Sequence, residues 1–391
     1  MTIAVSRRHG IRWILFLLAL TASAVGVPVP ARPLSQASFE QKSLDRLGAA
    51  EFSRLIQTLS EKDGYFRSDN FTSNETSYLH VVGKLREMGI SGGAYVGVGP
   101  EQNFTYIAKV RPHIAFIVDI RRQAVLQHLM YKALFQISEN RVEFLSGLLS
   151  RPLAGKGVPG KQDSIERILE FFNTAPASES TLAENLTRIQ RLIQEEFLFP
   201  LSEQDQDRLK YVYSMFQKEG LGIAFGSGGT SWGFPDLKDL ILQPDLNGNP
   251  GNFLSTEEDY RFVRDLQRRN LIVPVVGDFA GPKALGSVGE YLRAKQYTVS
   301  AFYTSNVERF LFQNEVFKSF VENVRKLPIA ADSVFIRSVS GRGQAHAAHI
   351  PGHRTTTLLQ KISVFLKDYD QGLYTDYRSL VSTNFIAGNK P

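Results

Sequence analysis

The sequence predicts an α/β protein in which helices cover both faces of a mostly parallel sheet. Two continuous apolar runs, Ala94–Val98 and Ile114–Val118, have the composition of strands that are buried on both sides. Between them, Phe104–Val110 has the composition of a short helix, which Pro112 would end. The alternation of apolar strand and helix resumes at Leu271. Apolar strands joined by helices indicate a parallel, doubly wound sheet.

The N-terminus has the layout of a secretory signal peptide. Three arginines between positions 7 and 12 precede the apolar run Ile14–Val25, and Ala22-Ser23-Ala24 fits a small-residue cleavage pattern. The apolar run is short for a membrane-spanning helix, which needs about 20 residues. We therefore expect residues 1–24 to be removed and the protein to be exported, either to the periplasm or outside the cell. An uncleaved N-terminal membrane anchor is the alternative.

Composition excludes several classes of protein. The formal net charge of +6 falls to +3 without residues 1–24, which hold three arginines and no acids, so the charge does not support nucleic-acid binding. The chain has no cysteine, which excludes disulfides, thiolate metal sites and cysteine nucleophiles. An ordinary apolar fraction of 43% fits a globular protein.

The remaining chain divides at changes in its apolar pattern. A proline-rich linker and an amphipathic helix lead to the polar, turn-rich segment Asp63–Ser77. Three amphipathic helical patterns, beginning at Ser164, Thr181 and Glu203, interrupt the strand pattern. The expected segments are a signal peptide (1–24), a linker with an N-terminal helical segment (25–77), the first half of the sheet domain (78–137), a mostly helical insertion (138–270) and the second half of the sheet domain (271–391).

Polar residues follow the strands of the second half. Leu271–Val276 ends in Gly277-Asp278-Phe279, and Thr298–Tyr303 is followed by Thr304-Ser305-Asn306. Ser333–Ser338 is the next expected strand, and Thr356–Asp370 has the apolar stripe of a helix. In open α/β sheets, ligands bind at the carboxyl ends of the strands. We therefore expect these polar residues to lie together at one ligand site.

The first strand and helix supply the clearest chemistry. Gly97 and Gly99 at the turn after the first strand would let the backbone approach a ligand, because no Cβ intervenes. Asp119 ends the next strand, 20 residues after Gly99, and a carboxylate there can accept two hydrogen bonds from a ribose diol. Gln102 stands where a dinucleotide fingerprint needs its third glycine, which disfavours NAD or FAD. A βαβ unit without a ligand remains the alternative.

Other residues are predicted to lie near this edge of the sheet. The polar segment Asp63–Ser77 and the helix after it could cover the edge, which makes Asn74, Glu75 and Tyr78 candidates for substrate contacts. Trp232, in the glycine-rich stretch after Phe225, could act as an apolar cap. A helix N-cap at Asn74 and a plain surface loop at Trp232 are the simpler interpretations.

These motifs together resemble a class I S-adenosylmethionine-dependent methyltransferase with its Rossmann-like core. Gly97-Val98-Gly99 stands where that family has its first glycine-rich motif, and Asp119 matches the acid that holds the ribose. Val276-Gly277-Asp278-Phe279 resembles the segment whose acid and neighbour contact the adenine. Ser305-Asn306-Val307 is similar to the segment after the fourth strand, beside the methyl group. The chain is also similar to an uncharacterised group of bacterial proteins with this core.

The resemblance departs from the family at two places. An acidic residue usually opens the first motif, but Gly93 and Ala94 lie there. After Thr356 the pattern offers one helix and little room for the family's last antiparallel strand pair.

The resemblance implies a methyltransferase of unknown acceptor with S-adenosylmethionine as its small-molecule ligand, and the N-terminal pattern makes it exported or membrane-anchored. Because S-adenosylmethionine is made in the cytosol, an exported binding protein that has reused the fold is the alternative. A metal enzyme would use His346, His349 and His353, but no strong helix pattern orients them, so no metal site is predicted.

Overall fold

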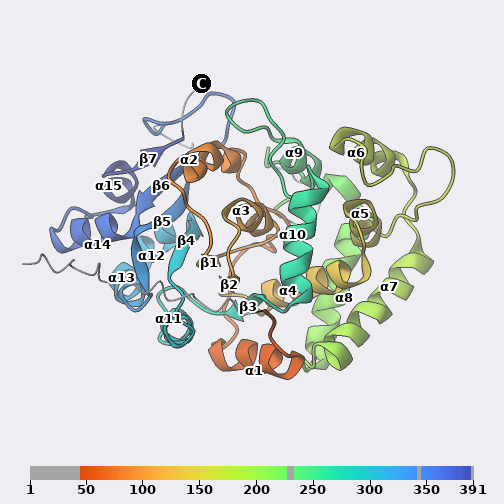
Figure 1. Cartoon of the computed structure of the whole chain (residues 1–391), viewed down its shortest axis with the longest axis horizontal. Coiled ribbons are helices and arrows are strands. Elements are labelled where there is room, and N and C mark those ends of the chain that lie inside the picture. The colour runs from red at the N-terminus through yellow and green to blue at the C-terminus, as the bar shows by residue number, and fades with distance from the viewer. Residues whose placement is uncertain (1–44, 227–232, 341–344, 389–391) are drawn as a thin grey trace, which may run out of the picture. The chain divides into compact units, whose positions relative to one another are not determined.

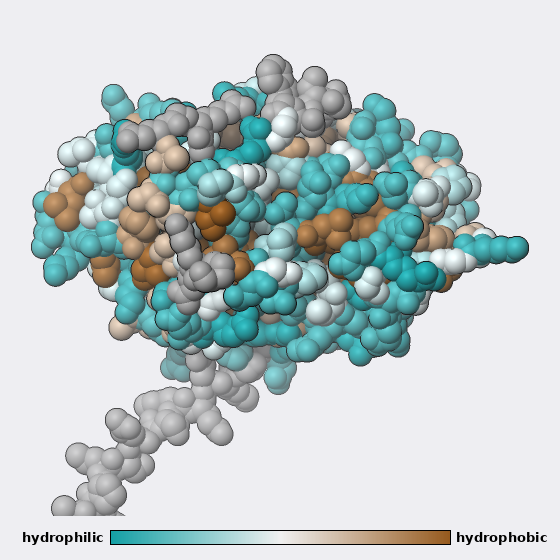
Figure 2. Space-filling model, turned by 90° about the horizontal axis from the view of Figure 1, so that it is seen from above, coloured by the Kyte–Doolittle hydropathy of each residue, from teal (hydrophilic) through white to brown (hydrophobic). Residues whose placement is uncertain are grey.

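The computed structural model describes residues 45–226, 233–340 and 345–388. The signal-peptide prediction for residues 1–24 and the cap proposed at Trp232 lie outside these ranges. Figure 1 shows the arrangement of the helices and strands. No helix in the part of the chain that is described combines the length and the apolar character needed to cross a membrane. On the face in Figure 2, hydrophilic side chains predominate and hydrophobic ones gather in patches between them.

The described strands form one mixed sheet in the order β3-β2-β1-β4-β5-β6-β7. Neighbouring strands from β3 to β5 run parallel, whereas β6 is antiparallel to β5 and β7 to β6. The predicted α/β class with a mostly parallel sheet is therefore confirmed. The strands are β1 (Ala94–Gly97), β2 (Ile114–Asp119), β3 (Ile272–Val276), β4 (Val299–Ser305), β5 (Ile329–Ser340), β6 (Thr355–Lys361) and β7 (Ile386–Ala387).

The first two strands pair as their composition predicts. Ala94 lies beside Ile114 and Gly97 beside Ile117 in a parallel register. Every residue of β1, β2 and β3 is buried, which explains why these strands are continuous apolar runs and do not alternate. Strands that are apolar on both faces of the sheet are stable only when other layers of the domain cover both faces.

Helices pack on both faces of the sheet. In Figure 1, α3 (Gln102–Val110), α4 (Arg122–Ile137) and α10 (Glu257–Arg268) lie on one side of the strands, and α11 (Ala284–Ala294), α13 (Phe317–Arg325) and α14 (Ile362–Asp370) on the other. The short helices that complete the sheet domain are α1 (Ala49–Leu59), η1 (Tyr78–Val81), α2 (Val82–Glu87), α12 (Val307–Gln313) and α15 (Tyr377–Ser382).

Where it is described, the chain between α4 and β3 consists of helices joined by loops, with two isolated bridges and no strand of the sheet. In Figure 1, its helices α5, α7 and α8 lie near α4, on the side away from the antiparallel strands. Ser202 and Asp205 form a capping box at the start of α8, the longest of these helices. The helices are α5 (Arg141–Leu149), α6 (Ile165–Thr174), α7 (Glu179–Arg191), η2 (Leu192–Glu196), α8 (Glu203–Glu219), η3 (Gly220–Gly222) and α9 (Leu237–Leu242), followed by α10.

The helix predicted over Thr356–Asp370 is wrong in its first half. Thr355–Lys361 is strand β6, paired antiparallel with β5, and the helix begins only at Ile362. Three consecutive threonines favour a strand because branching at Cβ restricts χ1 in a helix. Pairing also covers the edge that β5 would otherwise expose. The sheet therefore has the antiparallel strands for which the sequence pattern left little room.

Candidate functional site

A cavity of about 570 Å³ lies at the carboxyl ends of the parallel strands. It opens where the chain leaves β1 toward β2 on one side and β4 lies on the other, the point at which the strand order reverses. Open α/β sheets bind their ligands at such a switch point. The sheet therefore places a ligand-sized space where the sequence predicted one.

The cavity brings together most of the residues that the sequence singled out. Those that line it are Gly99, Asp119, Asp278, Phe279, Asn306, Asn74 and Glu75. Two others do not line it, namely Gly97 and Tyr78. Tyr78 is 1% exposed and donates its hydroxyl to the carbonyl of Leu240 at 2.7 Å, so the substrate contact predicted for it is wrong.

The two glycines of the first turn serve different purposes. Gly99 lines the cavity with a φ of +79°, a conformation that other residues rarely adopt. Gly97 leaves room for a neighbour, because a Cβ there would lie 2.0 Å from Oδ1 of Asn103. The Asn103 amide donates to the carbonyls of Val98, Gly99 and Pro100 and so holds the turn in shape. Gly97 therefore supports the turn from behind and does not face the cavity.

His128 of α4 braces the same turn. Its Nε2 lies 2.8 Å from the carbonyl oxygen of Gly99, so Nε2 carries the hydrogen and donates it. Burial lowers the pKa of His128 to about 4, although the Gly99 carbonyl opposes that shift. The imidazole is therefore neutral at physiological pH and acts as a fixed donor.

Asp119 lies at the cavity, but its two oxygens are already engaged. Arg121 donates from Nε to Oδ1 at 3.0 Å and from Nη2 to Oδ2 at 2.9 Å, and its backbone N–H also donates to Oδ1. The side chains of Asp119 and Arg121 are only 6% and 8% exposed. Each oxygen keeps lone-pair capacity for a ligand, because a carboxylate offers about four acceptor positions.

Arg121 continues from Asp119 to the polar segment 63–77, which we call the strap. Its Nη1 donates to the carbonyls of Ser68 and Asp69. Gln127 of α4 donates to the carbonyl of Phe71 at 2.7 Å, and Arg208 of α8 pairs with Asp63 at 2.7 Å. The strap therefore lies along the cavity, held by α4 and by a helix of the insertion.

Asp278 occupies a turn that another acid organises. Its Oδ1 accepts the N–H of Ala280 at 2.8 Å, and its own N–H donates to Glu61 at 3.1 Å. Glu61 also accepts the N–H groups of Lys283 and Ala284 at the start of α11, where an acid is favoured by the helix dipole. Glu61 therefore fixes the turn that presents Asp278 and Phe279 to the cavity.

Glu75 supplies a buried carboxyl group to the cavity wall. It is 1% exposed, accepts from Nε2 of Gln102 at 3.0 Å and also accepts from the hydroxyl of Ser305. Burial raises the pKa of Glu75, while the hydrogen bonds from Ser305 and Gln102 partly oppose the shift. A buried carboxyl group with a raised pKa is a candidate for proton transfer.

Two lining residues carry buried polar atoms without a partner in the described chain. They are Oδ1 of Asn70 and Oγ1 of Thr72, both in the strap. Unsatisfied buried polar atoms are uncommon in native proteins and call for an explanation. Both atoms have almost no solvent-accessible area, so they lie within the cavity wall and not on its open surface.

The three histidines after β5 do not converge on a metal site. His349 and His353 line the cavity, whereas His346 bonds the carbonyl of Val381 at 3.1 Å. Nδ1 of His353 bonds the carbonyl of Thr76 at 3.0 Å. Across the described ranges, no three His, Cys, Asp or Glu side chains gather closely enough to hold a metal ion.

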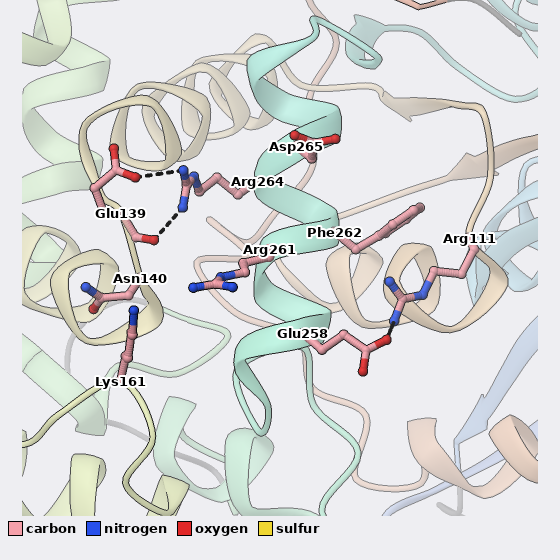
Figure 3. Close-up of a pocket in the computed structure, with 9 residues that line it drawn as sticks. All are labelled: Arg111, Glu139, Asn140, Lys161, Glu258, Arg261, Phe262, Arg264 and Asp265. Carbon is pink, nitrogen blue, oxygen red and sulfur yellow. Dashed lines mark hydrogen bonds and ion pairs between the residues drawn. The ribbon is translucent and has the colours of Figure 1, made fainter.

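A second hollow of about 510 Å³ lies along α10, away from the sheet edge (Figure 3). Its charged side chains pair largely with one another. Arg264 contacts Glu139 at 2.8 Å and Arg111 contacts Glu258 at 3.1 Å. None of the residues predicted to bind a ligand lies there.

A comparison with families of proteins identifies one match. The model of the family described as "Domain of unknown function (DUF7790)" matches residues 70–227 and 237–386. The chain belongs to this family. No curated protein matches. The part matched to the DUF7790 family includes Gly99, Asp119 and Asp278, whereas Phe66 and Arg67 at the start of the strap precede it.

Sequence reasoning missed several residues of this site. The missed residues hold the predicted ones in place through hydrogen bonds, and they are Arg121, Asn103 and Glu61. None of them belongs to a sequence pattern that is typical of a ligand site. Arg121 carried one local signal, since an arginine two residues after a strand-end acid is close enough to pair with it. Glu61 and Asn103 carried none.

Proposed function

We propose that the cavity at the β1–β4 switch point binds S-adenosylmethionine and that the protein is an exported or membrane-anchored methyltransferase of unspecified acceptor. The observation that carries the proposal is the convergence of Gly99, Asp119, Asp278, Phe279 and Asn306 on one cavity. These residues come from the ends of four strands, of which β1 and β2 lie more than 150 residues before β3 and β4.

The sheet supports this proposal in a second way. A parallel sheet of order 3-2-1-4-5 followed by antiparallel strands is similar to the methyltransferase core that the motifs resemble. Asp278 and Asn306 line the cavity, and their side-chain oxygens can accept hydrogen bonds from the hydroxyl and amino groups of a cofactor. The cavity residues thus suit an adenosine without needing a phosphate site.

The chain's own residues would then divide the work. Asp278 and Phe279 would hold the adenine end, and Gly99 would let the backbone approach the cofactor. When bound, S-adenosylmethionine supplies an electrophilic methyl group. Glu75 would accept the proton that a hydroxyl or amine acceptor loses as it gains the methyl group, and its buried position suits that exchange.

One observation favours the alternative, an exported binding protein without catalysis. Both carboxylate oxygens of Asp119 accept hydrogen bonds from Arg121, so a ribose diol would have to share this carboxylate with Arg121. In such a binding protein the cavity would still hold a ligand, and Asp119 would serve mainly to bind Arg121.

Titration calorimetry of the full-length protein tests the proposal. We expect S-adenosylmethionine and S-adenosylhomocysteine to bind with dissociation constants of about 1–100 µM, roughly −8 to −5 kcal/mol. Asp278→Asn should weaken binding. Asp332→Asn is the matched control, because Asp332 is an exposed acid near the amino end of β5, at the opposite edge of the sheet. Absence of heat from both ligands would remove the methyltransferase proposal.

A further inference from the structure

The two halves of the cavity differ in charge. Asp119 and Asp278 follow β2 and β3, so the β2–β3 half holds the carboxylates. Arg309 lies on α12 directly after β4, and Arg354 immediately precedes β6. Because β4 and β6 flank β5 in the sheet, these two arginines belong to the other half, which we call the β4–β6 half.

Arg67 of the strap belongs to the same half. Its neighbour Phe66 packs edge to face on Phe310 of α12, with ring centroids 5.4 Å apart. In the described chain, no carboxylate lies within ion-pair distance of Arg67 or Arg309. Two guanidinium groups thus line one cavity, and the described residues supply neither with a counter-ion.

Nearby acids do not balance this positive charge. Asp119 is neutralised by Arg121, and Glu75, whose oxygens accept from Gln102 and Ser305, offsets at most one of the three arginines. The remaining lining acid, Asp278, lies in the β2–β3 half. The β4–β6 half therefore has an excess of positive charge, which raises the local concentration of anions.

Aromatic rings line this half as well. Phe66 and Phe310 form one pair, and Phe225 and Phe234 form another with centroids 5.3 Å apart. The guanidinium of Arg354 lies over the ring of Phe234 at 4.6 Å. Flat apolar walls of this kind favour a planar apolar group, and the arginines favour an anion attached to it.

We infer that the β4–β6 half of the cavity binds a small molecule with a planar apolar body and an anionic group, held by Arg309, Arg354 and Arg67. The inference rests on the proposed function only in assigning the other half to S-adenosylmethionine; in that setting the anionic molecule is the methyl acceptor.

Two fluorescent probes of nearly equal shape test the inference. 8-Anilinonaphthalene-1-sulfonate has a planar apolar body and an anionic group, whereas N-phenyl-1-naphthylamine has the same body without the charge. We expect the full-length protein to bind the sulfonate with a stoichiometry of one and at least about 10-fold more tightly than the neutral probe, since a charge-assisted hydrogen bond is worth at least one decade.

Variants locate the effect. Arg309→Gln and Arg354→Gln should each weaken sulfonate binding by about 5- to 10-fold and leave the neutral probe unchanged. Arg188→Gln, at an exposed arginine on α7 away from the cavity, should change neither. Equal affinity for the two probes, failure of both to bind, or sulfonate binding that ignores both cavity variants would each overturn the inference.

A titration with S-adenosylhomocysteine separates this inference from the proposed cofactor. If S-adenosylhomocysteine does not bind but the sulfonate binds through the arginines, the cofactor proposal fails and the anion site stands. If S-adenosylhomocysteine binds while Arg309→Gln and Arg354→Gln leave sulfonate binding unchanged, the cofactor site stands and the anion site fails.

Discussion

One buried arginine–carboxylate pair lies at each half of the cavity. The two arginines donate their other N–H groups to different partners. Behind the β4–β6 half, Arg337 of β5 bonds Glu308 of α12 at 2.8 Å and Gln360 of β6 at 2.6 Å. In the wall of the β2–β3 half, Arg121 bonds Asp119 and also the carbonyls of the strap. The first pair joins core elements to one another, whereas the second joins the cavity wall to the segment that lies along it.

The environments of the two pairs also differ. The side chains of Glu308 and Arg337 are 0% and 3% exposed, and the guanidinium lies 4.4 Å from the ring centroid of Phe335. Burial raises the pKa of Glu308, against the lowering effect of Arg337. Removing one partner of such a pair leaves an uncompensated charge in the core. The same kind of ion pair therefore stabilises the core at Arg337–Glu308 and positions the strap at Arg121–Asp119.

The largest effect is expected from breaking the β4–β6 pair. Glu308→Ala should lower the free energy of unfolding by about 3–5 kcal/mol, because Arg337 would keep its charge without a counter-ion. Urea unfolding followed by circular dichroism measures it. Glu322→Gln, at a surface pair with Arg325, is the control and should change the free energy by no more than about 0.5 kcal/mol. A loss for Glu308→Ala as small as the control's would contradict this account.

A buried acid without an arginine sharpens the comparison. Glu101 accepts the N–H of Ser73 at 3.2 Å, and burial raises its pKa to about 7. Between about pH 4.5 and 7 the folded protein keeps a proton that the unfolded chain has lost, so this group's contribution to stability falls as pH rises through that range.

Glu101→Gln should remove that dependence. The variant should be more stable than the wild type at pH 8 by up to about 3 kcal/mol, with a smaller difference at pH 4.5. Buried His128, whose pKa is lowered, titrates in the opposite sense but is common to both proteins and cancels in the difference. Unfolding curves at both pH values measure it, and a difference that does not change with pH would contradict the prediction.

The smallest change in stability is expected at the β2–β3 pair. Asp119→Ala should lower the free energy of unfolding by about 2 kcal/mol, less than Glu308→Ala, because Arg121 keeps two carbonyl acceptors. Asp119→Asn should cost less, since it retains one acceptor.

The same variant tests whether the pair holds the strap. Hydrogen exchange of the strap amides should become faster in Asp119→Ala, and S-adenosylmethionine binding should weaken at least about 10-fold if Asp119 also contacts the ribose. The Glu308→Gln variant should leave strap exchange unchanged. Identical exchange in wild type and Asp119→Ala would show that Arg121 holds the strap without help from Asp119.

The fold could be predicted where the signal was local. The strands β1 and β2 are continuous apolar runs with a helix between them, so their parallel pairing followed from composition. The strand β6 also carried a local signal, the three threonines from 355 to 357, but the apolar spacing of the following helix obscured it. Because short apolar runs fit either period, the partner strand β5 decided between them.

The site could be predicted less well, because its decisive contacts join distant residues. Glu75 comes from a polar stretch that composition places at the surface, yet Gln102 and Ser305, 27 and 230 positions away, bury it. Tyr78 was predicted to contact the substrate, but it is buried in the core, where its hydroxyl donates to the carbonyl of Leu240. No window of sequence contains these partners.

The sequence by itself determined the parallel core, the glycine turn at Gly99 and the gathering of polar residues at the strand ends, because each depends on residues within one βαβ unit. Only the tertiary structure decided what those residues face. A carboxylate accepts hydrogen bonds from whichever donors the fold brings within about 3 Å. Because hydrogen-bond strength falls steeply beyond that distance, spacing in the sequence alone does not identify the donor. Glu75 therefore meets Gln102 and Ser305, while no acid of the described chain lies within ion-pair distance of Arg67 or Arg309 at the cavity.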